Sequence, residues 1–448
     1  MALNAHLPGK DVFQIHVLNS QFLCSWRGFR FVEDIRESIV YLYSITLDMN
    51  QRLLVLLLII SVLSISCKSR ESGKREPTGE LSVTYISVGN KSPNHHFKEI
   101  CDNPELIRLE TSDSIVLGQI SKIVQAKGNI YILENNLNRV FVFDLRGTYL
   151  YSLGLHGRGP KEVLSINDID IDREAGHLLL LSTESKCVQT YDLDGRYINT
   201  VRLGFQCFRF AHMEDGINAF FINYFNEEPY NLRIIGPKKT DIRLFPYPEK
   251  IFPMYFYFTG GLKGTNSHTA LYSEATSSKI YEVCSDGDFH LKYDIDLGSK
   301  QWPESMKYQF ADFMTAISGF KADFLGSKYL ELDSLLYFDF MSGNRFRDAY
   351  YFFDSGKLLI RGDNLTDDDF SKCMSGPLGL SEKGGLIAIV DPLKLYEANI
   401  SDQYLLNVYS IERDLLNMVE PGDNPLLFFY GFKGANHAKA TSHDYFDN

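Results

Sequence analysis

Residues Ile120–Gly154 read ISKIVQAKGNIYILENNLNRVFVFDLRGTYLYSLG, and residues Ile166–Gly204 repeat the pattern as INDIDIDREAGHLLLLSTESKCVQTYDLDGRYINTVRLG. The two stretches start 46 residues apart, and their Asp-x-x-Gly turns, at Asp144 and Asp192, lie 48 residues apart. Each stretch holds four runs rich in strand-forming residues, joined by turn residues. An Asp followed by Gly favours a tight turn, because Asp bonds the local backbone and Gly adopts positive φ. The pattern therefore predicts two units of four β-strands.

Two further copies of the pattern occur later in the chain. KIYEVCSDGDFHLKYDIDLG begins at Lys279, and AYYFFDSGKLLIRG begins at Ala349. Four strands in a repeat of about 45 residues are typical of a β-propeller blade. The sequence therefore predicts an all-β fold, a β-propeller with four-stranded antiparallel blades.

Two predicted insertions decide the number of blades. SKQWPESMKYQFADFMTAI, from Ser299, and QYLLNVYSIERDLLNMV, from Gln403, carry apolar residues at helical spacing. If both are inserted helices, the remaining length fits six blades better than seven. A propeller ring closes by pairing strands from its two ends, so we expect a strand near Leu106–Glu110 to share a blade with Leu426–Phe432.

The stretch LGLHGRGPKEV, Leu153–Val163, resembles a glycine-rich phosphate loop. Such a loop is followed by a helix whose N-terminus adds its dipole. Here the residues after Pro160 alternate with a period of two, which indicates a strand. The stretch is therefore interpreted as a turn between two blades, in which Gly157 or Gly159 adopts positive φ, and nucleotide binding is not expected.

The composition argues against a nucleic-acid partner. The chain has 448 residues, a formal net charge of −12 and a pI near 5.4. A nucleic-acid surface needs clustered Lys and Arg, and no run of them offsets this acidic balance.

A secretory signal is indicated by MNQRLLVLLLIISVLSISCKS, which starts at Met49. Arg52 precedes an apolar run of roughly 13 residues, shorter than the roughly 20 that a membrane span needs. This stretch resembles a bacterial lipoprotein signal, in which Cys67 would become the lipid-bearing N-terminus. An ordinary signal peptide and a short buried helix are the alternatives. A signal begins close to the start of translation, so we expect translation to start at Met49.

The other cysteines give no metal or disulfide signature. Outside the first 67 residues they are scattered and form no Cys-x-x-Cys pair; they are Cys101, Cys187, Cys207, Cys284 and Cys373. We expect most of these side chains to be buried, with one or two disulfides at most.

Several stretches together resemble the six-bladed β-propeller lipoproteins of Bacteroides-type bacteria, which are related to NHL-repeat and TolB-like propellers. They are IRLETSDSIVLGQISKI from Ile107, GRGPKEV from Gly157, the FDLRG and YDLDG turns, and DNPLLFFYGFK from Asp423. Lys161 stands where that family usually has Gly. The resemblance implies a propeller exported to the cell envelope and tethered to the periplasmic or outer-membrane side.

These observations divide the chain into five parts. We expect residues 1–48 to be an untranslated extension, 49–66 a lipoprotein signal peptide and 67–104 a tether with an N-terminal segment. Residues 105–433 would form the six-bladed propeller, and 434–448 a C-terminal tail.

Candidate ligand-binding residues fall into two groups. His156, Arg158 and Lys161 make the glycine-rich turn locally basic, which suits an anionic glycan or a carboxylate. Asp168 and Asp170 share one face of a strand with Asp172 and could meet a basic ligand or a cation in the channel. The alternatives are a solvated turn and a solvated strand face.

Metal binding is the less favoured interpretation of the remaining polar residues. His156, His212 and His268 are evenly spaced, but the spacing differs from the blade period, so we expect them at different depths. Asp363, Asp367, Asp368 and Asp369 lack the order of an EF-hand loop; a helix N-cap at Thr366, with acids in the first turn, explains them.

The sequence thus favours a non-catalytic binding or scaffolding module for a protein, peptide or glycan, with no cofactor. The aromatic stretch Phe245–Gly261 suits either a ligand surface or packing between blades. The alternative is a metal-dependent enzyme of the lactonase or lyase kind at the channel mouth, with Ca²⁺ or Zn²⁺ as the candidate ion.

Overall fold

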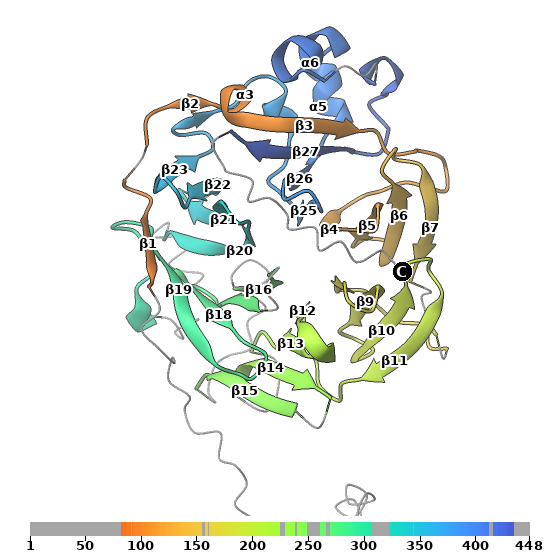
Figure 1. Cartoon of the computed structure of the whole chain (residues 1–448), viewed down its shortest axis with the longest axis vertical. Helices are drawn as coiled ribbons and strands as arrows, with labels where there is room; N and C mark the ends of the chain where they lie inside the picture. The colour runs from red at the N-terminus through yellow and green to blue at the C-terminus, as the bar shows by residue number, and fades with distance from the viewer. Residues whose placement is uncertain are drawn as a thin grey trace, which may run out of the picture. The chain divides into compact units, whose positions relative to one another are not determined.

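The computed structural model describes residues 82–90, 92–154, 157–159, 161–224, 229–237, 240–248, 260–265, 269–306, 322–343, 345–411 and 415–433. Six antiparallel, four-stranded blades, here named A to F in chain order, surround a central channel (Figure 1). The expected six-bladed β-propeller is confirmed. In the part of the chain that the structure describes, no helix is both long and apolar enough to span a membrane.

Blades A to C follow the repeat along the chain, and each begins with its innermost strand. Blade A contains β4 (Ile120–Ala126), β5 (Asn129–Glu134), β6 (Arg139–Asp144) and β7 (Tyr149–Leu153). Blade B contains β8 (Asp168–Asp172), β9 (His177–Ser182), β10 (Cys187–Asp192) and β11 (Tyr197–Arg202). Blade C contains β12 (Arg209–His212), β13 (Asn218–Phe221), β14 (Tyr230–Gly236) and β15 (Thr240–Pro246).

Blades D and E keep this order, and blade D gains an extra strand. Blade D contains β16 (Gly261–Gly264), β17 (Ala270–Ser273), β18 (Lys279–Val283) and β19 (Phe289–Asp296). The N-terminal strand β1 (Thr84–Ser87) pairs with β19 in parallel on the outer edge of this blade. Blade E contains β20 (Phe324–Glu331), β21 (Leu335–Ser342), β22 (Arg345–Phe352) and β23 (Lys357–Ile360).

Blade F closes the ring with strands from both ends of the chain. It contains β25 (Gly379–Leu380), β26 (Leu386–Val390), β27 (Leu426–Phe432) and β3 (Cys101–Ile107). The outermost strand β3 pairs with β27, with Leu106 opposite Phe428 and Ile107 opposite Leu427. The expected closure is confirmed. The expected start of the propeller, residue 105, falls inside β3. The strand continues through Pro104, where its pairing with β27 is interrupted.

The N-terminal segment also contacts blade E on its way to blade F. The short strand β2 (His95–His96) pairs in parallel with β24 (Leu365–Thr366), and the helical turn α3 (Phe97–Ile100) leads into β3. Thr366 therefore lies in a strand rather than at the expected helix N-cap. The Asp368 carboxylate instead accepts hydrogen bonds from the Phe370 and Ser371 amides, at the 3₁₀ turn Ser371–Cys373.

The two helical insertions expected from the sequence lie before blade E and within blade F. The predicted helix from Gln403 is found as α6 (Asp402–Tyr409), after α5 (Pro392–Glu397), both inserted between β26 and β27. Of the stretch from Ser299, residues 299–306 are described and contain the 3₁₀ turn Glu304–Met306, and the rest of the expected helix lies outside the described residues.

The core is divided among the seams between neighbouring blades. Each of the apolar clusters found among the described residues joins two adjacent blades; the pairs are A–B, B–C, C–D, D–E, E–F and F–A. Burial of apolar surface at every seam makes each blade depend on both of its neighbours. The described cysteines are all free, and all but Cys284 are buried.

The Asp-x-x-Gly turns behave as the sequence predicted. The Asp144 carboxylate accepts hydrogen bonds from the Arg146 and Thr148 amides at 2.8 and 2.9 Å, and Gly147 has φ of 82°. The equivalent Gly195 in blade B has φ of 86°. Only glycine adopts this conformation without strain.

The glycine-rich stretch joins the outer strand β7 to the inner strand β8 and is followed by a strand, as expected. Gly154 and Gly157 have φ of 102° and 155°. The Glu162 carboxylate accepts a hydrogen bond from the Gly159 amide at 2.7 Å. The Glu162 side chain therefore takes up an amide donor that a phosphate loop would present to its ligand.

Gly154 is the position in this stretch where a side chain is least compatible with the fold. A Cβ there would lie 2.4 Å from Ile166 Cδ1 and 2.9 Å from the Asn138 carbonyl oxygen. We expect Gly154→Ala to lower the free energy of unfolding by about 2 to 4 kcal/mol, through positive φ and overpacking. At Gly159 a Cβ would meet only the flexible Glu162 carboxylate, at 3.0 Å. Denaturant unfolding of both alanine variants tests the contrast, and equal losses would contradict it.

Candidate functional site

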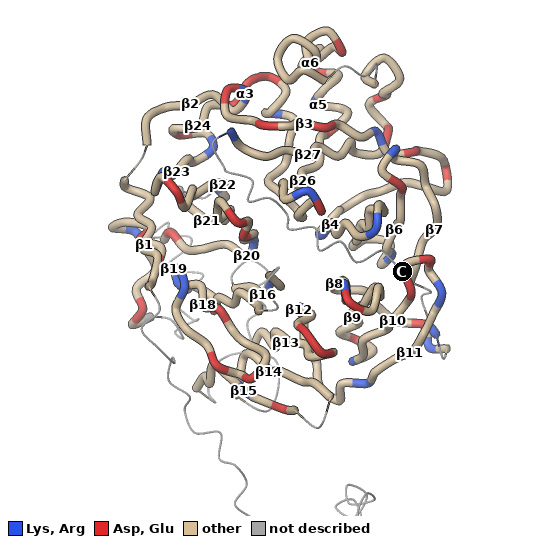
Figure 2. Tube along the Cα trace, in the orientation of Figure 1, with Lys and Arg blue, Asp and Glu red and all other residues tan. Residues whose placement is uncertain are grey.

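A cavity of about 710 Å³ lies at one mouth of the central channel. Its walls are the ends of the inner strands and the turns that follow them, and all six blades contribute; the lining includes Lys122–Val124, Asp170–Glu174, His212–Glu214, Lys263–Thr265, Leu330–Ser334 without Glu331, and Leu378–Gly384. Charged residues of both signs stand close to the channel (Figure 2). We call this cavity the channel mouth.

Asp168 lies below the mouth, and its side chain links the inner strands of three blades. It is 1% exposed; Oδ1 accepts a hydrogen bond from Lys122 Nζ at 2.9 Å, and Oδ2 accepts one from the Phe210 amide at 3.0 Å. Burial raises the pKa of the carboxyl, but attraction to Lys122, Arg209 and Lys263 outweighs it and lowers the pKa below its ordinary value. Asp168 is therefore an ionised, buried bridge between β4, β8 and β12.

Asp170, two residues after Asp168 on β8, is bonded in a similar way. Its Oδ2 accepts a hydrogen bond from the His212 amide at 2.9 Å, and its Oδ1 accepts one from the Ile171 amide at the same distance. Unlike Asp168, Asp170 is only partly buried and lines the channel mouth. The alternation of Asp and Ile along β8 thus joins the backbones of blades B and C.

Lys263 on β16 is a further cation that lines the mouth. Its side chain is partly buried, and it forms no hydrogen bond or ion pair with the described residues. Burial and repulsion from Lys122 and Arg209 outweigh the attraction to Asp168 and Asp170 and lower the pKa of its amine to about 7. An anionic group placed beside this amine would favour its charged form.

The other candidate residues are not brought together with Asp168 and Asp170. Lys161 is exposed, and its Nζ lies 5.2 Å from the centre of the Tyr197 ring, near the outer strand β11. Arg158 is exposed in the same turn, and His156 lies outside the described residues. The turn leads into β8 at Asp168, whereas the mouth lies at the other end of that strand.

The histidines and acids considered for metal binding have other partners where they are described. His212 Nδ1 lies 3.1 Å from Asn218 Oδ1, and its Nε2 lies 3.6 Å from Asp172 Oδ2. Asp367 pairs with Arg361, and Asp368 accepts hydrogen bonds from Tyr404 and Tyr409. His268 and most of the aromatic stretch from Phe245 fall outside the described residues. No group of three or more potential metal ligands occurs within the described ranges.

Sequence reasoning missed Lys263 as a site residue. It belongs to GLKG, a short strand whose resemblance to the inner strands β4 and β8 is weak. Closure of the ring places it beside Asp168 and Asp170, and no local sequence pattern indicates that position. The sequence could have indicated Lys263 only through its residue type, because a lysine in an inner strand of a propeller lies next to the channel.

A search of solved structures returns propellers of low sequence identity. A presumed exported protein of Bacteroides fragilis superposes with a TM-score of 0.63 at 16% identity, covering 79% of this chain and 100% of that one. A member of the DUF4221 family from Bacteroides vulgatus gives 0.45 at 10% identity, covering 74% of this chain and 97% of that one. A streptogramin B lyase gives 0.40 at 10% identity, with coverages of 75% and 100%. The first of these likenesses supports the fold.

Sequence comparison places the chain in a family. A search of curated proteins gives no match. Residues 83–431 match the family described as "Domain of unknown function (DUF4934)". This range begins one residue before β1 and ends one residue before the last residue of β27, so it contains the six blades, apart from Phe432, and the N-terminal strands. The chain therefore belongs to the DUF4934 family.

Proposed function

We propose that this protein is an exported, lipid-anchored propeller that binds, without chemical turnover, a carboxylate-bearing ligand of protein, peptide or glycan origin at the channel mouth. The observation that carries the proposal is Lys263, an amine that lines a 710 Å³ cavity and forms no hydrogen bond or ion pair with the described residues. The signal-like sequence before Cys67 and the exported relative from Bacteroides fragilis support the envelope location.

Two acids of the mouth, Asp170 and Asp172, favour binding over catalysis. A general acid or base needs a carboxyl or imidazole that can reach the substrate and exchange a proton with it. The Asp170 carboxylate is held by two amides, and that of Asp172 accepts a hydrogen bond from the Ala175 amide at 2.9 Å. These groups fix the backbone of the mouth, which suits a preformed binding surface.

Calorimetry with simple acids and their neutral counterparts tests this proposal. We expect acetyl-trialanine or tri-galacturonic acid to bind about tenfold more tightly than the matching amide or methyl ester, because a partly buried amine–carboxylate contact contributes about 1.4 kcal/mol. Lys263→Met should remove this preference. Affinity should fall as the pH rises above about 7, since the amine then loses its proton before the ligand binds.

Lys383→Met is the matched control. Lys383 lines the same cavity, but its side chain is 82% exposed and lies 3.7 Å from Glu105. We expect this variant to bind like the unaltered protein. Equal affinity for acid and neutral forms, or the same loss in both lysine variants, would overturn the proposed role of Lys263. Stoichiometric Ca²⁺ or Zn²⁺ in the purified protein would instead favour the metal-dependent enzyme.

A further inference from the structure

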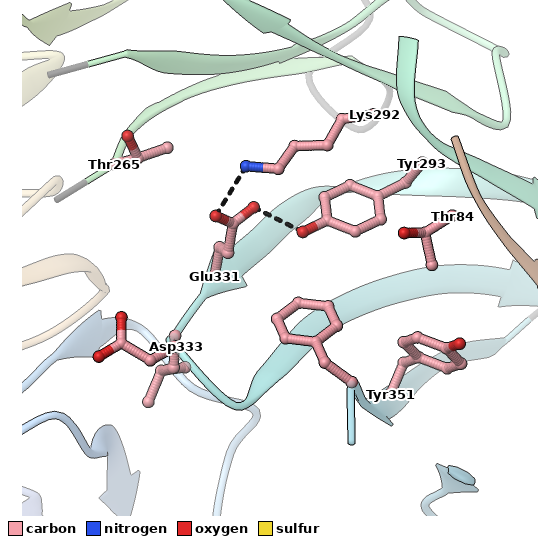
Figure 3. Close-up of a pocket in the computed structure, with 9 residues that line it drawn as sticks. Thr84, Thr265, Lys292, Tyr293, Glu331, Asp333 and Tyr351 are labelled. Carbon is pink, nitrogen blue, oxygen red and sulfur yellow. Dashed lines mark hydrogen bonds and ion pairs between the residues drawn. The ribbon is translucent and has the colours of Figure 1, made fainter. Parts of the chain in front are cut away.

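A second cavity, of about 610 Å³, opens at the seam between blades D and E. We call it the seam pocket. Strands β1 and β19, the turn after β20 and the end of β22 all contribute to it; its lining is Thr84, Thr265, Lys292, Tyr293, Glu331, Leu332, Asp333, Tyr351 and Phe353. Figure 3 shows Glu331 between Lys292 and Tyr293.

A hydrogen-bonded network crosses the pocket and holds Glu331 in place. One oxygen of Glu331 accepts a hydrogen bond from Lys292 Nζ at 2.9 Å, and the other accepts one from the Tyr293 hydroxyl at 2.6 Å. Lys292 Nζ also contacts Glu282 Oε1 at 2.8 Å, and His290 Nε2 lies 3.2 Å from Glu282 Oε2. The network fixes the position of the Glu331 carboxylate before any ligand arrives.

The seam pocket carries an excess of negative charge. Among the described residues of the network and its rim, one lysine, Lys292, stands against the carboxylates of Glu282, Glu331 and Asp333. The net charge therefore stays negative even with a positive charge on His290. Burial lowers the pKa of Lys292, but its hydrogen bonds to Glu282 and Glu331 outweigh this and raise it, so the lysine remains charged. Asp333 is exposed at the rim and has no hydrogen bond or ion pair with the described residues.

Both the carboxylates and the aromatic rings of the seam pocket suit a cation. Among the described residues, each Glu331 oxygen accepts one hydrogen bond, which leaves capacity for another. The rings of Tyr293 and Phe353 are nearly parallel, at 9°, and Tyr351 lies edge-on to Phe353 with centroids 6.1 Å apart. Aromatic faces attract ammonium and guanidinium groups, and Lys292 Nζ already lies 5.8 Å from the Tyr293 ring.

The seam pocket adjoins the channel mouth. Thr265, Leu332 and Asp333 line both cavities. The mouth offers the amine of Lys263, and the seam pocket offers the exposed carboxylate of Asp333 and the remaining acceptor capacity of Glu331. One ligand that carries both signs of charge would match both cavities.

We infer that the seam pocket binds the basic side chain of a peptide whose carboxylate lies at Lys263. This inference rests on the proposed function and narrows its ligand to a peptide with a lysine or arginine close to a free carboxylate. Glu331 and Asp333 are the residues that would recognise the basic group, and Tyr351 and Phe353 would cover its aliphatic part.

Calorimetry on the full chain with a small peptide series tests this inference. The probes are acetyl-lysine followed by one, two or three alanines with a free carboxylate, the same peptides as amides, and the series with norleucine in place of lysine. We expect the best lysine peptide to bind about tenfold more tightly than its norleucine counterpart, a difference of about 1.4 kcal/mol. Glu331→Gln and Asp333→Asn should each reduce this advantage to about threefold or less.

The variants and outcomes separate the two proposals. Glu397→Gln, an exposed acid on α5 outside both cavities, should keep the lysine advantage. Asp333→Asn has no described hydrogen bond to lose, so it remains informative if Glu331→Gln impairs folding. Equal binding of lysine and norleucine peptides, with the carboxylate still required, would overturn the inference alone. Equal binding of acids and amides would overturn the proposed function, and no binding of any peptide would overturn the peptide inference.

Discussion

Deletion of Leu426–Lys433, together with the tail that follows it, is expected to abolish the cooperative unfolding transition of the propeller. These residues form β27, which lies between β26 and β3 in the closing blade. Leu426, Leu427 and Phe428 are fully buried there. Their loss would remove the cores of two seams, expose the edge of β26 and release β3. The combined cost should reach the whole stability of an ordinary domain, about 5 to 15 kcal/mol.

Truncation after Lys433 is the control for this deletion. The strand pairs of blade F are complete at Phe432, and the Lys433 amide donates a hydrogen bond to the Ile100 carbonyl oxygen. We expect this shorter truncation to unfold like the full chain. Thermal unfolding followed by circular dichroism compares the two, and a longer truncation that melts within a degree or two of the control would contradict closure by β27.

Replacement of Asp168 by alanine is expected to lower the free energy of unfolding by about 3 to 5 kcal/mol, the range for removing one partner of a buried ion pair. The change leaves Lys122 buried without its counter-charge and the Phe210 amide without its acceptor. Arg209 and Lys263 would also lose the carboxylate that stabilises their charge. Denaturant unfolding at pH 7 measures the loss.

Two further variants identify the cause of this loss. Asp172→Ala, on the same strand, removes a partly exposed carboxylate that accepts a hydrogen bond from the Ala175 amide, and should cost about 1 kcal/mol. Lys122→Met combined with Asp168→Ala should recover part of the loss, since no unpaired lysine then remains at that position. A double variant less stable than Asp168→Ala would show that the ion pair is not what makes Asp168 important.

The blades could be predicted from the sequence because their determinants are local. Alternation of apolar residues within a strand and an Asp-x-x-Gly turn between strands lie within a few residues of one another, as at Asp144 and Gly147. The closure was predictable as well, because a ring of sheets without a free edge needs its two ends to pair. Thr366 was assigned wrongly because its pairing partner, His96, lies 270 residues away and leaves no local pattern.

The charges of the channel and of the seam pocket could not be predicted in the same way. Lys122, Asp168 and Lys263 come from blades A, B and D, and only the radius and stagger of the ring decide which of them meet. Sequence patterns showed that Asp168 and Asp170 share a strand face, but not that this face bonds the backbone of β12. Similarly, nothing near Thr84 indicates that it forms part of a wall beside Tyr293.

The path of the N-terminal segment has a consequence for the order in which the molecule assembles. Strand β1 pairs with β19, β2 with β24 and β3 with β27, and the Ser87–Asp296 and Arg108–Asp423 contacts span 209 and 315 residues. Contacts between residues so distant in sequence form slowly, because a long loop must close first. Strands β1, β2 and β3 are synthesised before the blades and must therefore remain unpaired until β19, β24 and β27 have been made. Until then, their edges are open to pairing with other chains.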